Sequence, residues 1–151
     1  MILNQQHEVR LALRPLESFL RRVKRELGLS QSGVTICLVS NAAMARLNQN
    51  FRRKKGPTDV LSFPTVARQR PMRLRHKSNG RNSAKREYLG DIAISPATAR
   101  RYAKKQKRPL TRELRVLILH GVLHLLGYDH ETDHGEMDEI EQKLRKRFGL
   151  S

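Results

Sequence analysis

The chain has 151 residues, of which 38% are hydrophobic and 30% charged, as expected for one ordinary globular domain over residues 1–151. Its 31 Lys and Arg against 14 Asp and Glu give a formal net charge of +17, which favours a polyanionic partner such as nucleic acid. The longest apolar run, 116–126, is too short for the roughly 20 residues of a membrane-spanning helix, and the single cysteine excludes an internal disulfide. The first residues lack a secretory signal pattern, so we expect no membrane partner and a cytoplasmic location.

The first part of the chain predicts alternating strands and helices. A short strand over 1–4 precedes a helix with Pro15 in its first turn and Gly28 at its end. The apolar positions of this helix recur at three- and four-residue steps: Leu16, Phe19, Leu20, Val23 and Leu27. The β-branched run 34–39 predicts a buried strand, followed by a short helix over 42–50. Residues 59–63, closed by Pro64, predict another strand.

The second part begins with a strongly basic segment. Residues 66–86 contain eight Lys and Arg and no acid, which predicts an exposed basic insertion. A strand over 88–94 then leads through Ser95 into a helix ending near residue 106. Thr111 opens a strongly apolar helix that ends at Gly127, and a last helix starts near residue 135. This interleaving predicts an α+β fold, in which helices pack on a mixed sheet of about four strands.

The histidines are clustered: four of the six lie between His120 and His134. His120 and His124 are four residues apart on the apolar helix, so their imidazoles project from one face on successive turns. Gly127 can take a positive φ and reverse the chain, which brings His130 back towards the same point. The pattern therefore predicts a metal site at the end of this helix, built from His120, His124 and His130.

Three neutral imidazoles leave the fourth tetrahedral position of zinc open, as in catalytic sites. We expect one Zn²⁺, although imidazole also suits Ni²⁺, Cu²⁺ and Fe²⁺. Seven of the 14 acids lie between residues 129 and 141, and this local negative charge favours a cation. Asp129, Glu131 and Asp133 are candidates either to orient the ligands or to cap the last helix, and His134 has no assigned role.

The same histidine spacing occurs in metzincin proteases, in which a Glu directly after the first His is the general base. The corresponding residue here is Gly121, so that mechanism lacks a proton acceptor that typically contributes about 10²–10⁴ in rate. A zinc metallopeptidase-like hydrolase is therefore an alternative and not the first interpretation.

Three segments together resemble a known family. HGVLHLLGYDH, residues 120–130, is similar at every fixed position to the signature H-G-x-L-H-L-x-G-Y-D-H of the YbeY family of metal-dependent endoribonucleases. FRRKKGPTDVLSFP, residues 51–64, resembles the family segment Y-R-x(4)-P-T-D-V-L-S-F-P, and LGDIAIS, residues 89–95, resembles L-G-D-I-x-I-S. This chain departs from the pattern at Phe51, where the family usually has Tyr, and in the uniformly basic segment 66–86.

The resemblance implies a single-strand-specific endoribonuclease acting in 16S ribosomal RNA 3′-end maturation and ribosome quality control. It implies zinc on the three histidines, Arg52 at the active site, and single-stranded RNA, small-subunit ribosomal RNA and the ribosome as partners. A guanidinium such as that of Arg52 can clamp a phosphate through two hydrogen bonds. We expect RNA to lie across the basic segments 66–86 and 100–115. A non-catalytic, zinc-containing ribosome-binding factor is the remaining alternative.

Overall fold

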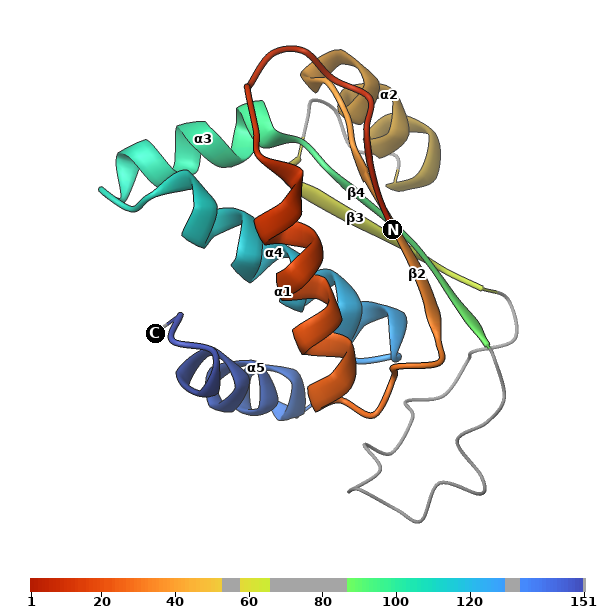
Figure 1. Ribbon diagram of the computed structural model, residues 1–151. Helices are drawn as coiled ribbons and strands as arrows, with labels where there is room; N and C mark the ends of the chain where they lie inside the picture. Colours follow the sequence, from red (N-terminus) through yellow and green to blue (C-terminus); the bar gives the residue numbers. More distant parts are fainter. Residues whose placement is uncertain (53–57, 66–86, 130–133, 151) are drawn as a thin grey trace.

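The computed structural model describes residues 1–52, 58–65, 87–129 and 134–150 (Figure 1). Within these ranges the elements are β1 (Ile2–Asn4), α1 (Leu13–Glu26), β2 (Gly33–Leu38), α2 (Asn41–Arg52), β3 (Val60–Pro64), β4 (Tyr88–Ile94), α3 (Pro96–Lys105), α4 (Leu110–Leu125) and α5 (Glu136–Arg147). The predicted α+β class is confirmed. The predicted basic insertion 66–86 lies outside the described residues.

The strands form one mixed sheet in the order β1-β2-β4-β3. β1, β2 and β4 are parallel, whereas β3 runs antiparallel to β4 and forms an edge. Ile2 lies opposite Ile36, and Ile36 lies opposite Ile92, so aliphatic side chains form a row across the sheet. Pro64 extends β3 by one residue beyond the prediction, because an edge strand tolerates a residue that cannot donate to a second neighbour.

The two faces of the sheet differ, because successive side chains of a strand point to opposite sides. Ile36 and Ile92 are fully buried in the main core, which also contains residues of α1, α3, α4 and α5. The alternate residues Cys37 and Ala93 belong to a smaller cluster with Leu47 of α2. We call the side of α1, α3, α4 and α5 the covered face and the side of α2 the open face (Figure 1).

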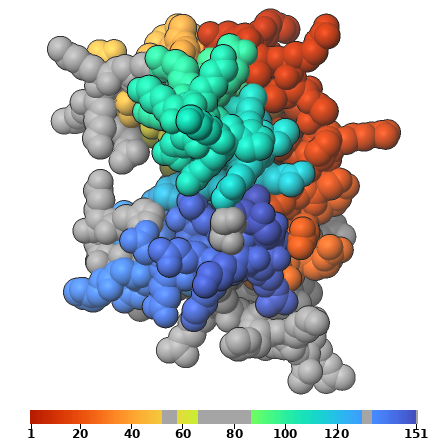
Figure 2. Space-filling model, turned by 90° about the vertical axis from the view of Figure 1, so that its left-hand side faces the viewer, coloured from red at the N-terminus to blue at the C-terminus, as the bar shows by residue number. Residues whose placement is uncertain are grey.

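Helix α4 is central to the covered face. It contacts β3 and β4 as well as α1, α3 and α5, and the outer surfaces of α3 and α5 form much of one side of the molecule (Figure 2). Gly121 permits its close approach to β4, since an added Cβ would lie 2.8 Å from Cγ2 of Ile92. The hydroxyl of Ser62 in β3 donates to the Gly121 carbonyl at 3.3 Å, so the second half of α4 is joined to the edge strand.

Helix ends follow most of the predicted signals. The Ser95 side chain accepts from the Thr98 amide at the start of α3, and Gly127 has a φ of +99° just after α4. α1 begins at Leu13, so Pro15 lies in its first turn as predicted, where the amides have no intrahelical acceptor and a proline costs little. α2 continues past the predicted end at residue 50 to Arg52. Among the described residues, no helix is long and apolar enough to cross a membrane.

Candidate metal centre

Two of the three predicted ligands meet on the last two turns of α4. The Nε2 atoms of His120 and His124 are 3.0 Å apart. The ring centroids are separated by 4.5 Å, with an interplanar angle of 72°. Both rings are half-buried, so the pair is reachable from solvent. The prediction that the four-residue spacing brings these nitrogens together is confirmed.

A carboxylate from α5 fixes the His120 ring. Oε1 of Glu141 lies 2.9 Å from Nδ1 of His120, and the Glu141 side chain is 9% exposed. Because an ionised carboxylate only accepts hydrogen bonds, Nδ1 donates and the lone pair of His120 sits on Nε2, facing His124. Arg145 approaches Oε2 of the same carboxylate at 3.7 Å, so its positive charge offsets that of the buried anion.

This arrangement fits the donor set of a metal. Two imidazole nitrogens bound to one tetrahedral zinc at ~2.0–2.1 Å are about 3.3 Å apart, and the observed 3.0 Å lies within a small ring movement of that value. A carboxylate on the opposite nitrogen is the usual support for a ligating histidine. Within the described residues no group of three candidate ligands is present. His130 lies outside them, and its participation stays a prediction.

A second carboxylate stands near the pair. Asp59 directly precedes β3, and its backbone carbonyl accepts from the Ser95 amide at 2.9 Å. Burial raises the pKa of the Asp59 carboxyl above its usual value, while backbone hydrogen bonds and the attraction of His120 act in the opposite direction. The site therefore combines a histidine pair with a carboxyl group whose charged form is disfavoured by its surroundings.

Sequence reasoning missed Glu141 and Asp59. It considered Asp129, Glu131 and Asp133 as orienting groups, whereas Glu141 holds Nδ1 of His120. A signal for Glu141 was available, because it lies on the apolar face of the last helix between Met137 and Leu144, both of which are buried. Glu131 and Asp133 lie outside the described residues. His134 is exposed, and its backbone amide donates to Oε2 of Glu136 at 2.6 Å.

Arg52 is the last residue of α2, and its role at the active site stays a prediction. Its neighbour Phe51 contacts Phe63 of β3, with ring centroids 5.1 Å apart. Ser62, which precedes Phe63 in β3, donates a hydrogen bond to the carbonyl of Gly121, which lies between the two histidines. A short series of contacts thus connects the end of α2 with the histidine pair across the edge strand.

The fold and the site are those of a candidate hydrolase: a small mixed sheet whose central helix ends in a carboxylate-supported histidine pair. Residues 1–149 match the family model of Endoribonuclease YbeY, and the chain belongs to that family. Membership makes the chain an endoribonuclease, a hydrolase that acts on RNA.

Individual relatives agree with this assignment. The chain is 41% identical to the endoribonuclease YbeY of Koribacter versatilis over 135 residues, covering 89% of this chain and 76% of the relative. Identity to the Solibacter usitatus protein of the same name is 38%, with 89% and 78% covered. The solution structure of TM1509 from Thermotoga maritima superimposes with a TM-score of 0.63 at 27% identity, covering 99% of this chain and 90% of that one.

Proposed function

We propose that this chain is a single-strand-specific endoribonuclease that depends on one zinc ion held by His120, His124 and His130. The observation that carries the proposal is the convergence of the two Nε2 atoms at 3.0 Å, with the opposite nitrogen of His120 bonded to Glu141. Two ring nitrogens that meet at 3.0 Å, with the opposite nitrogen of His120 held by a carboxylate, form the part of a zinc site that the described residues contribute.

The protein residues have separate tasks in this proposal. When bound, the ion supplies the positive charge that polarises a phosphoryl oxygen during cleavage. Glu141 keeps the proton of His120 on Nδ1, so that Nε2 remains a ligand. Arg145 balances the charge of Glu141, which otherwise would be costly to hold at 9% exposure. Arg52 contacts the scissile phosphate and stabilises negative charge that develops on its oxygens.

The wider role follows from the family resemblance. We propose that the substrate is single-stranded RNA of the small ribosomal subunit, that the reaction serves 16S 3′-end maturation and ribosome quality control, and that the protein acts in the cytoplasm with the ribosome as partner. The net charge of +17 supports a polyanionic substrate, because each phosphate neutralised by Lys or Arg releases bound counterions. Binding is therefore expected to weaken steeply with salt.

The peptidase alternative meets a steric objection. The Cβ of a glutamate at position 121 would clash with Ile92, because it would lie 2.8 Å from Cγ2 and 2.9 Å from Cδ1 of that residue. Gly121 is buried between α4 and the sheet, so a carboxylate there would point into the core and not towards solvent. The non-catalytic alternative differs in its dependence on Arg52, since a structural zinc site does not need that guanidinium.

The test compares two arginines of α2. Arg52→Glu is expected to retain zinc and to lose cleavage of single-stranded ribosomal RNA by at least about 10²-fold, because repulsion replaces a charge that stabilises the transition state. Arg46→Glu, an equal charge change at an exposed position of the same helix, should cleave within a few-fold of wild type. Zinc is measured by elemental analysis and cleavage on gels. Near-normal cleavage by Arg52→Glu would contradict the assigned role and favour a different catalytic arrangement.

A further inference from the structure

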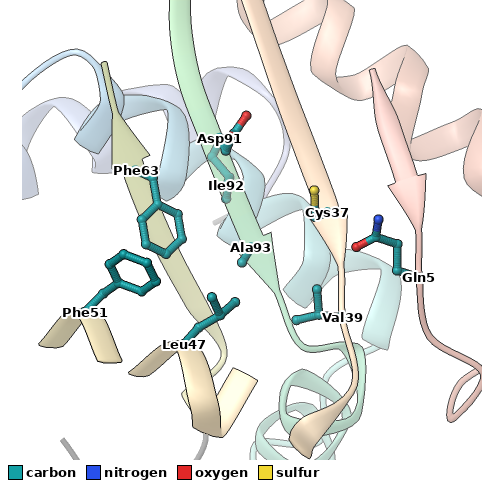
Figure 3. Close-up of a pocket in the computed structure, with 9 residues that line it drawn as sticks. All are labelled: Gln5, Cys37, Val39, Leu47, Phe51, Phe63, Asp91, Ile92 and Ala93. Atoms are coloured by element: carbon teal, nitrogen blue, oxygen red, sulfur yellow. The ribbon is translucent and has the colours of Figure 1, made fainter. Parts of the chain in front are cut away.

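The open face of the sheet carries a pocket of about 410 Å³ beside α2 (Figure 3). Its volume is in the range of small-molecule sites. Phe51 and Phe63 stand on one side of it, Cys37 and Gln5 on the other, and Ala93 lies between them. The remaining lining residues are Val39, Leu47, Asp91 and Ile92. The pocket lies on the side of the sheet opposite α4 and is distinct from the histidine pair.

The aromatic side of the pocket is unusually exposed. Phe51 is 64% exposed although it is fully apolar, and Phe63 is half-buried. Their rings meet edge to face, with centroids 5.1 Å apart and an interplanar angle of 74°. This geometry leaves the ring of Phe51 largely open to a flat partner. Exposed aromatic rings are the usual platforms on which proteins stack single-stranded bases.

The other lining residues define what the occupant must be. Val39, Leu47 and Ala93 are apolar, so the body of the ligand must be apolar or aromatic. Asp91 contributes a carboxylate, whose neighbour is the hydroxyl of Tyr88. An ionised carboxylate accepts hydrogen bonds and repels phosphate, so the ligand must present N–H groups at this end and keep its negative charge elsewhere.

The position of the pocket supplies the link to RNA. Phe51 is followed directly by Arg52, the residue proposed to contact the scissile phosphate. The two residues are neighbours at the end of α2, so the proposed subsite places the base at Phe51 next to the phosphate at Arg52 in one RNA strand. The net charge of +17 is complementary to such a strand, whereas Asp91 makes the pocket itself unsuitable for its backbone.

We infer that this pocket is a nucleobase subsite, in which a base of single-stranded RNA stacks on Phe51 and turns an amino-bearing edge towards Asp91. This inference rests on the proposed function for the placement of the neighbouring phosphate. Adenine, cytosine and guanine carry an exocyclic amino group that a carboxylate can accept from. Uracil presents carbonyl oxygens on both sides of its single ring N–H, which a carboxylate repels, so it is the disfavoured base.

The first experiment measures binding of short fluorescent RNA strands by anisotropy. The full-length protein is used with its own metal content, and the strands carry 2′-O-methyl groups to resist cleavage. Phe51→Ala should weaken binding of an adenine-containing strand about five- to a hundredfold, the effect of losing one base stack. Phe51→Tyr keeps the ring and should bind within about twofold of wild type.

A second readout does not depend on any substitution. Cys37 is the single cysteine of the chain and lines the pocket, so alkylation at this position is read directly from the protein mass. Burial raises the pKa of its thiol, so the reaction is run at alkaline pH to increase the thiolate fraction. An adenine-containing strand should slow alkylation several-fold, whereas an abasic strand with the same number of phosphates should not.

The outcomes separate the two proposals. Equal affinity of Phe51→Ala and wild type, or equal protection of Cys37 by abasic and base-containing strands, overturns the subsite even if the enzyme cleaves RNA. Loss of ribosome association by Phe51→Ala with unchanged RNA affinity also overturns it, in favour of a protein partner at this face. If wild type binds RNA through Phe51 but never cleaves it, the subsite stands and the proposed catalytic function fails.

Discussion

The four phenylalanines of the chain form two pairs, one on each side of the sheet. Phe19 and Phe148 meet on the covered face at 5.5 Å and 74°, and they are 6% and 7% exposed. Phe51 and Phe63 meet on the open face at 5.1 Å and 74°, yet Phe51 is 64% exposed. Nearly the same ring contact therefore closes the core on one side and leaves an aromatic surface on the other.

The two faces of the sheet carry different features. The covered face holds the aliphatic core and the histidine pair, which α4 and α5 position together. The open face holds a pocket to which α2 is the only described helix that contributes lining residues, Leu47 and Phe51. Strand β3 belongs to both sides, because Ser62 bonds to Gly121 of α4 while the adjacent Phe63 contacts Phe51 of α2. A strand of RNA that engages both sides would have to pass this edge.

The largest effect expected from this comparison is on stability. Phe19→Ala should lower the free energy of unfolding by about 3–5 kcal/mol, because it removes a buried ring and leaves a cavity. Phe51→Ala should change it by no more than about 0.5 kcal/mol, since the ring is mostly in water already. Urea denaturation of both variants gives the two values. Similar decreases in the free energy of unfolding would mean that the Phe51–Phe63 pair stabilises the fold as much as the Phe19–Phe148 pair, which would contradict the contrast between the faces.

A smaller effect is expected on zinc affinity at the covered face. Glu141→Gln should weaken zinc binding about 10- to 100-fold, because the support of His120 loses its charge. Glu139→Gln is the matched control: it lies on the same helix, is 71% exposed and pairs only at 3.7 Å with Lys143. Competition with a chromophoric zinc chelator measures both affinities. Equal zinc affinities in the two variants would contradict the role of Glu141 in supporting His120.

Local patterns predicted much of the fold. The β-branched run before residue 40 became β2, Ser95 became the cap of α3, and Gly127 took its positive φ after α4. These features depend on neighbours in sequence, which is why the residues alone reveal them. The place of Pro15 in the first turn of α1 was predicted in the same way, because a proline there leaves no intrahelical hydrogen bond unmade.

The site was predictable only where one helix contains it. The spacing of His120 and His124 is a property of α4, and their contact was foreseen. Glu141 comes from α5, so its approach to His120 depends on how the two helices pack, and its place on a buried helix face was the only local signal. The pocket depends on which part of the sheet α2 leaves uncovered, which no local pattern specifies. The roles of His130 and Arg52 stay predictions.

The central claim is that the histidine pair of α4 is a metal-dependent catalytic centre. The most direct measurement is elemental analysis of purified wild type and His120→Ala, paired with cleavage of single-stranded ribosomal RNA with and without a chelator. Wild type should contain one equivalent of zinc and stop cleaving when chelated, whereas His120→Ala should lack both zinc and activity. A metal-free His120→Ala protein that cleaves RNA as fast as wild type would contradict the account.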